Sequence, residues 1–159
     1  MTSDADKTLD DALDGLRFAM VATADPDHGG RWGSRPLALA DARGGVLRFL
    51  VSTTADWVSG LESKGSPTTV TFSDPVKNSF VALQGSARTV DDRALIAELW
   101  NLGAAAWFAG KDDPAIRVLE VAVEHGEFWD GPHGRIGHVL QGVKAALGQH
   151  AGGRGDVVV

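Results

Sequence analysis

The sequence predicts a mainly β protein with flanking helices, built as a small six-stranded antiparallel barrel. Segments rich in apolar and β-branched residues follow one another closely, and turn residues such as Asp25-Pro26 and Gly44-Gly45 separate them. The first connections are too short for the crossovers that parallel strands require, so a doubly wound parallel sheet is disfavoured. One helical segment falls between the third and fourth strands and a longer one follows the fifth, which places helices beside the barrel.

The first half of the chain is expected to form a short helix and then a three-stranded meander. Leu9, Leu13 and Leu16 recur at helical spacing within the acidic segment Thr2–Leu16, which indicates an amphipathic helix. The three strands are expected at Phe18–Ala24, Trp32–Asp41 and Val46–Val51. Pro36 cannot donate to a sheet ladder, so the second strand must begin at a sheet edge, a bulge or a ligand.

The second half of the chain is expected to alternate longer strands with helices. Gly85 is expected at a bulge or bend, and Asp91 and Asp92 are suited to cap the longest helix. The predicted elements are a helix at Ser52–Lys64, strands at Thr68–Ser73 and Ser79–Val90, a helix at Arg93–Trp107, a strand at Val118–Asp130 and a strand running into a helix at His138–Leu147. We expect a single domain over residues 1–147 and a flexible tail over residues 148–159.

Composition excludes several classes of protein. The chain contains no cysteine, which excludes disulfides and thiolate metal sites and favours a cytoplasmic location. A formal net charge of -6 argues against a nucleic-acid partner, because proteins that bind phosphate backbones are usually basic. No segment approaches the roughly 20 apolar residues of a membrane helix, and the acidic N-terminus lacks the features of a secretory signal.

Common catalytic motifs are absent from the sequence. It contains no GxGxxG after a strand, no GxxxxGK(S/T), no HExxH and no GxSxG. Of the histidines, only His133 and His138 lie close together, and their spacing suits neither one helical face nor one strand face. We therefore expect no metal site, and solvent-exposed loop histidines are the simpler interpretation.

Three features of the sequence have both a structural and a ligand-binding interpretation. Arg35, between Ser34 and Pro36, is either a surface arginine of an edge strand or a guanidinium beside a bound anion. The run Ser52-Thr53-Thr54 either caps the following helix or forms an anion seat where the strand gives way to the helix. Trp107 is either a core or interface residue or an aromatic wall against a planar ring.

Short motifs in a consistent order cover most of the chain from Phe18 to about Leu147. They are FAMVAT at Phe18–Thr23, SRPL at Ser34–Leu37, LRFLVS at Leu47–Ser52, DPVKNSFVALQGSARTV at Asp74–Val90, LW at Leu99–Trp100, AWF at Ala106–Phe108 and EFWDGPHGR at Glu127–Arg135. In these motifs and in the order of its elements, the chain resembles the flavin-binding split-barrel family that includes pyridoxamine 5'-phosphate oxidases. The resemblance is greatest to the general-stress-protein branch of that family.

The resemblance implies a six-stranded split barrel that forms a homodimer with two FMN sites at the subunit interface. Two adjacent strands would run along the flavin, with the residues Ser34, Arg35, Pro36 and Leu37 on one and Phe49, Leu50, Val51 and Ser52 on the other. Trp107, at the end of the long helix, would approach the flavin ring from the other subunit.

The chain departs from this family at the helix after the third strand. Family members usually carry a lysine there, in a pattern like Ser-x-Lys, that pairs with the FMN phosphate, whereas this sequence has Ala55-Asp56-Trp57. Loss of a charge-assisted contact costs about 1.5–3 kcal/mol, or roughly ten- to a hundredfold in affinity. The chain is therefore expected to bind FMN weakly, to bind FAD or a deazaflavin instead, or to have lost the cofactor, unless Arg35 or Lys77 compensates.

The sequence leaves the function open between two main hypotheses. The first is a flavin-dependent oxidoreductase of unknown small-molecule substrate, in which no side chain stands out as a catalytic acid or base. The alternative is a non-catalytic dimeric protein that holds a flavin or another flat ligand, which Trp57 in place of lysine favours. A remnant of the fold that binds no flavin is a third option. Oxidation of vitamin B6 is disfavoured, because the substrate-binding Arg-x-His pattern of such oxidases is not recognisable near the C-terminus.

Overall fold

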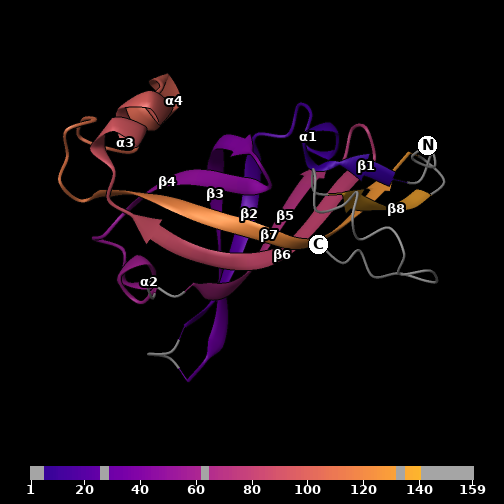
Figure 1. Cartoon of the computed structure of the whole chain (residues 1–159), viewed down its shortest axis with the longest axis horizontal. Helices are drawn as coiled ribbons and strands as arrows, with labels where there is room; N and C mark the ends of the chain where they lie inside the picture. The colour runs from indigo at the N-terminus through magenta and orange to yellow at the C-terminus, as the bar shows by residue number, and fades with distance from the viewer. Residues whose placement is uncertain (1–5, 26–28, 62–64, 132–134, 141–159) are drawn as a thin grey trace.

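The computed structural model describes residues 6–25, 29–61, 65–131 and 135–140, and it contains a closed antiparallel barrel of six strands. The barrel strands are β2 (Phe18–Asp25), β3 (Arg31–Arg43), β4 (Val46–Ser52), β5 (Ser66–Asp74), β6 (Ser79–Val90) and β7 (Ile116–Asp130). Their order around the barrel is β7-β4-β3-β2-β5-β6, and pairing of β6 with β7 closes it (Figure 1). The predicted mainly β fold with a six-stranded barrel is confirmed.

Short helices and two further strands lie around the barrel. These elements are β1 (Asp6–Thr8), α1 (Leu9–Ala12), α2 (Asp56–Ser59), α3 (Arg93–Leu99), α4 (Leu102–Ala105) and β8 (Arg135–Leu140). β8 extends the sheet beyond β7, and β1 pairs with β8 in the parallel direction. Along the long axis of the molecule, α3 and α4 lie at one end and β1, α1 and β8 lie at the other (Figure 1). None of the helices in the described ranges is long and apolar enough to cross a membrane.

The predictions for the first two helices were wrong in extent. Within the described part of Thr2–Leu16, the chain forms β1 and then a single helical turn, because the Thr8 hydroxyl accepts from the Asp11 amide and starts the helix late. The predicted helix at Ser52–Lys64 is reduced to α2. Its N-cap is Ala55, which makes no side-chain hydrogen bond, so the interpretation of Ser52, Thr53 and Thr54 as helix caps is also wrong.

The predicted long helix at Arg93–Trp107 is broken into α3 and α4. Asp92 caps α3 as expected, since its carboxylate accepts from the Leu95 amide at 3.0 Å. The helix ends at Trp100, whose backbone is extended, and a new turn starts because the Asn101 side chain accepts from the Ala104 amide at 2.9 Å. The strand predicted within His138–Leu147 corresponds to β8, whereas residues 141–159, including the predicted tail, lie outside the described ranges.

The barrel interior is filled by alternate residues of each strand. In β4, for example, Leu47, Phe49 and Val51 are buried and their neighbours are partly exposed. Leu9, Leu13 and Leu16 close one side of this core, and Val58 of α2 packs into the same cluster. Burial of these apolar side chains is the main source of stability for a chain without disulfides.

Gly85 lies at a bulge, as the sequence predicts. The register between β6 and β7 shifts between Gln84 and Gly85, because their partners His125 and Val123 leave Glu124 of β7 as the extra, bulged residue. A Cβ atom at Gly85 would lie 2.9 Å from the carbonyl carbon of Ala122, on the neighbouring strand. The two backbones therefore approach too closely for any residue other than glycine.

One outer face of the barrel carries a row of alternating charges. Arg48 of β4 donates to Asp41 at 3.0 Å and to Glu120 at 2.9 Å, and Arg88 donates to Glu120 at 3.0 Å. Each pair is directly opposite in register, so the row crosses β3, β4, β7 and β6 in turn. These charges are satisfied within the chain.

Another outer face of the barrel has no charged residue among those described. We call it the uncharged face, and it consists of Phe18, Met20, Ala22 and Ala24 of β2, Trp32, Ser34, Pro36 and Ala38 of β3, Thr69, Thr71 and Ser73 of β5, and Phe80, Ala82 and Gln84 of β6. Phe18 is 68% exposed and Met20 is 44% exposed. A continuous surface of this composition is unusual for a face that remains in water.

Candidate functional site

The barrel is split between β3 and β4. These strands pair only near their hairpin, from Leu39 opposite Phe49 to Arg43 opposite Val46. Beyond Leu39, β3 pairs with β2 on its other side, and beyond Phe49, β4 pairs with β7 on its other side. Two strand edges therefore face each other across a gap, which we call the split, and Pro36 lies on one of them, as its lack of an N–H group predicts.

A cavity of about 320 Å³ occupies the split. This volume is at the lower end of the roughly 300–1,000 Å³ that small-molecule sites usually have. Its lining contains no charged side chain among the described residues, and only Ser52 and Asn101 are polar. The lining residues are Phe18, Pro36, Leu37, Ala38, Leu39, Ala40, Leu50, Val51, Ser52, Ala55, Trp57, Asn101, Ala104, Trp107 and Phe108.

A second apolar cluster fixes the position of the segment from α3 to Phe108, which covers one side of this cavity. Ile96 and Leu99 of α3 are buried against Ile116 and Val118 of β7. Phe108 packs on this cluster and also lines the cavity. The segment that follows α4 is therefore held against the barrel by apolar side-chain packing, although no continuous helix connects it to α3.

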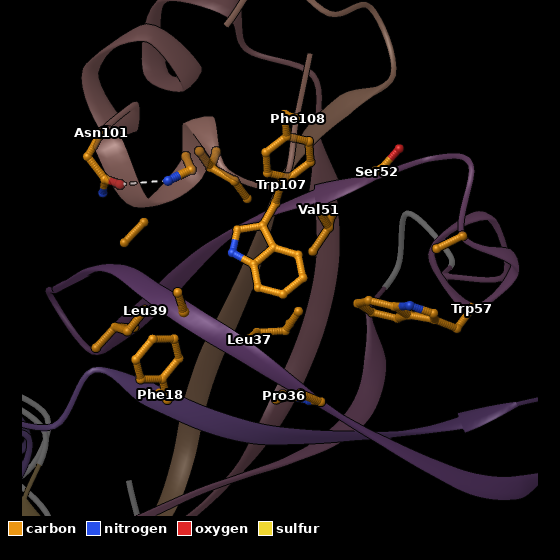
Figure 2. A pocket seen from close by; sticks show the side chains of 15 residues that line it. Phe18, Pro36, Leu37, Leu39, Val51, Ser52, Trp57, Asn101, Trp107 and Phe108 are labelled. Atoms are coloured by element: carbon orange, nitrogen blue, oxygen red, sulfur yellow. Dashed lines mark hydrogen bonds between the residues drawn. The ribbon is translucent and has the colours of Figure 1, made fainter. Parts of the chain in front are cut away.

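Trp107 lies over the cavity with most of its surface exposed. The amides of Trp107 and Phe108 both donate to the carbonyl of Ala104, at 2.9 and 3.2 Å, which ends α4 in a tight turn. The indole of Trp107 then reaches from this turn towards Leu37 and Val51 (Figure 2). The side chain is 79% exposed, although it lines the cavity, so it is available to a ligand as a flat apolar wall.

An arginine stacked on a tryptophan forms one end of the site. The guanidinium carbon of Arg35 lies 4.2 Å from the ring centroid of Trp57, a cation–π contact. Nη1 of Arg35 donates to the Thr23 hydroxyl at 2.8 Å and to the Val21 carbonyl at 3.3 Å. Trp57 lines the cavity on the side opposite Phe18 and Asn101 (Figure 2). Positive charge therefore lies next to the Trp57 end of an otherwise uncharged cavity.

Most residues predicted to contact the ligand meet at this cavity. Those in the lining are Pro36, Leu37, Leu50, Val51, Ser52, Trp57 and Trp107. Arg35 touches the lining through Trp57, Ser34 is exposed on the uncharged face, and the Phe49 side chain is fully buried in the barrel core. The roles of all ten residues in binding stay predictions.

One detail of the site differs from the expectation, and another stays a prediction. Trp107 lines the cavity of its own chain, and its approach to a ring bound by another subunit stays a prediction. The Ser52 hydroxyl is engaged with Thr54, 2.8 Å from its hydroxyl oxygen, and also accepts from the Thr54 amide at 3.2 Å. No group of three metal-ligating side chains occurs in the part of the chain that the structure describes.

Several lining residues were not singled out from the sequence. In the sequence, nothing separates Phe18, Leu39 and Phe108 from ordinary core residues. Asn101 falls inside the segment that is predicted as one continuous helix. Only Asn101 carries a usable signal, because asparagine favours the N-cap position and so indicates the break that turns Trp107 towards the barrel.

Comparison with known proteins identifies the family. The family model described as pyridoxamine 5'-phosphate oxidase like matches residues 4–152. The chain therefore belongs to the pyridoxamine 5'-phosphate oxidase-like family. Among proteins with curated functions, none matches this chain.

Solved structures similar to this chain include several general stress proteins. The general stress FMN/FAD binding protein of Xanthomonas citri is 28% identical, with 76% of this chain and 84% of that chain covered and a TM-score of 0.63. A general stress family protein of Xanthomonas campestris is 29% identical, with 76% and 82% covered and a TM-score of 0.63. A protein of Clostridium acetobutylicum related to general stress protein 26 is 22% identical, with 76% and 84% covered and a TM-score of 0.65, which supports the fold alone.

Proposed function

We propose that this chain binds a flavin in the split and acts as a flavin-dependent oxidoreductase on a small molecule. The observation that carries the proposal is the uncharged cavity between two unpaired strand edges, covered by an exposed tryptophan. A flat ring fits between Trp107 and the apolar residues of β3 and β4. The strand edges offer backbone N–H and C=O groups, which match the amide-like rim of an isoalloxazine ring.

FMN is the proposed cofactor, with FAD and a deazaflavin as alternatives. One similar protein, from Xanthomonas citri, is described as binding FMN or FAD, which supports a flavin in this family. Within this chain, Arg35 beside Trp57 supplies a cation for a phosphate group at one end of the cavity.

The residues of the cavity would bind and orient rather than transfer protons. None of the described lining residues carries a carboxylate, an imidazole, an amine or a thiol, so bound flavin would supply the redox chemistry. Trp107 and Phe108 would exclude water from one side of the ring. The alternative function is a non-catalytic protein that holds a flavin, which the absence of acid–base groups from the described lining equally allows.

The experiment that tests the proposed function begins with the absorption spectrum of the purified protein. We expect a yellow protein that releases FMN on denaturation, or one that binds added FMN. We propose that the protein acts in the cytoplasm, where NADH and NADPH are both present. Anaerobic addition of either donor should bleach the flavin absorption band, and an added electron acceptor should restore it. A bound flavin that neither donor reduces would favour the non-catalytic alternative, and a protein that binds no flavin would contradict both.

We further propose that the protein is a homodimer in which the uncharged face is the subunit contact. A surface without charge, with Phe18 68% and Met20 44% exposed, is suited to contact a second copy of itself. Phe18, Pro36 and Ala38 belong both to this face and to the cavity lining. A partner seated there would therefore border the cavity, which supports a ligand site next to the interface.

Replacement of Phe18 by glutamate should dissociate this dimer. Two symmetry-related carboxylates would be buried in an apolar contact, so light scattering coupled to gel filtration should give the monomer mass for Phe18→Glu. Val76→Glu is the matched control, because Val76 is 93% exposed at the β5–β6 turn and lies outside the uncharged face. The control should remain dimeric. A wild-type protein that is monomeric at micromolar concentration would contradict the proposal.

A further inference from the structure

We infer that Trp57 is a positioning residue: it holds Arg35 so that the cavity prefers ligands carrying a phosphate group at the Trp57 end. This inference rests on the proposed function, because the ligand is taken to be a flavin. It assigns to Trp57 a role in specificity that acts through the arginine and not through contact with the phosphate itself.

Arg35 is held on several sides. Its guanidinium stacks on the Trp57 ring at 4.2 Å, and Nη1 is fixed by the Thr23 hydroxyl and the Val21 carbonyl. Gly33 leaves room for the other end of the group, since a Cβ atom there would lie 2.8 Å from Nη2. The plane of the guanidinium is thereby fixed before any ligand arrives, which reduces the entropy lost when it binds an anion.

The charge of Arg35 acts at one end of the cavity only. No lysine or arginine is among the described lining residues, and Arg35 meets the lining at Trp57. Phe18 and Asn101 mark the opposite end (Figure 2). A ligand with a flat apolar part and an anionic tail would therefore bind in one orientation, with its tail at Trp57 and its ring under Trp107.

Trp57 is needed in this arrangement because the guanidinium of Arg35 stacks on the face of its ring. An aliphatic residue at this position would keep apolar contact with the core but would not attract the cation. The side chain of Arg35 would then sample more orientations, and its hydrogen bonds to a phosphate would weaken.

The test compares FMN with riboflavin, which has the same ring and lacks the phosphate. Dissociation constants are measured by calorimetry for the wild type and for Trp57→Leu, Trp57→Phe, Arg35→Met and Trp107→Leu. The wild type should bind FMN more tightly than riboflavin. Trp57→Leu should reduce this preference about tenfold, and Arg35→Met should reduce it at least as much. Trp57→Phe, which keeps an aromatic face, should retain most of it.

Trp107→Leu is the matched control, because it removes an indole from the ring end of the same cavity. It should weaken both ligands equally and leave the preference unchanged. The double variant Trp57→Leu with Arg35→Met should lose no more preference than Arg35→Met alone, since both changes act on one contact. Melting temperatures of the ligand-free variants identify any variant that fails to fold, and Trp57→Phe then carries the comparison.

Three results would overturn the inference. Trp57→Leu could keep the full preference for FMN, which would show that Arg35 does not need to stack on Trp57 to bind the phosphate. The wild type could bind FMN and riboflavin equally, which would show that the Trp57 end has no anion subsite. Binding of neither ligand would contradict the proposed function as well, and it is distinguishable from the first two results because the wild type alone reveals it.

Discussion

Replacement of Gly85 by alanine is expected to destabilise the protein by about 3 kcal/mol, and to lower its melting temperature by about 6–12 °C. The Cβ atom would lie 2.9 Å from the carbonyl carbon of Ala122 and 3.1 Å from the Cα atom of Val123. Both are backbone atoms of β7, so no change of side-chain rotamer relieves the contact, and the β6–β7 ladder that closes the barrel must move apart. Thermal and urea unfolding measure the effect.

Gly110→Ala is the matched control for this prediction. A Cβ atom at Gly110 meets nothing within 4 Å, so its replacement should change the free energy of unfolding by less than about 0.5 kcal/mol. Equal stability of Gly85→Ala and the wild type would contradict this close approach of β6 and β7 at the bulge.

The Trp107→Ala variant is expected to lose about tenfold in flavin affinity while keeping its melting temperature. Trp107 is 79% exposed, so the fold gains little from its burial, but its indole lines the cavity as a flat apolar surface. Calorimetric titration with FMN measures the affinity. The loss should appear with riboflavin to the same extent, because the contact is to the ring.

Val76→Ala provides the comparison for this variant. Val76 is 93% exposed and lies outside both the cavity lining and the uncharged face, so its replacement should leave the affinity unchanged. If Trp107→Ala bound FMN as tightly as the wild type, the flavin would not lie beneath the Trp107 indole.

The strands of the barrel could be predicted from the sequence because local signals mark them. Alternating burial in β4 and turn residues such as Gly44-Gly45 depend on neighbours in the chain. The glycine of β6 that faces the bulge in β7 is likewise visible as an isolated glycine within a strand pattern. The helices were overestimated because apolar spacing around Leu95, Leu99 and Leu102 fits a longer helix. The break at Trp100 depends on one competing hydrogen bond, which the Ala104 amide donates to the Asn101 side chain.

The site could be predicted only in part. Pro36 and the run from Leu50 to Ser52 were recognised as ligand-facing through the family resemblance, and both border the split. The split itself follows from where β3 and β4 stop pairing, which depends on their competing partners β2 and β7. The stacking of Arg35 on Trp57 joins residues of different elements, and no local pattern indicates it.

The central claim is that the split between β3 and β4 holds a flavin. Hydrogen–deuterium exchange with and without saturating FMN tests it most directly, because it reports on the backbone amides along the two strand edges. If a flavin binds in the split, exchange should be slower at Ala38 and Ala40 and along residues 50–52 when FMN is present, and unchanged at the β5–β6 turn around Val76. Unchanged exchange along both edges, or protection confined to β5 and β6, would contradict it.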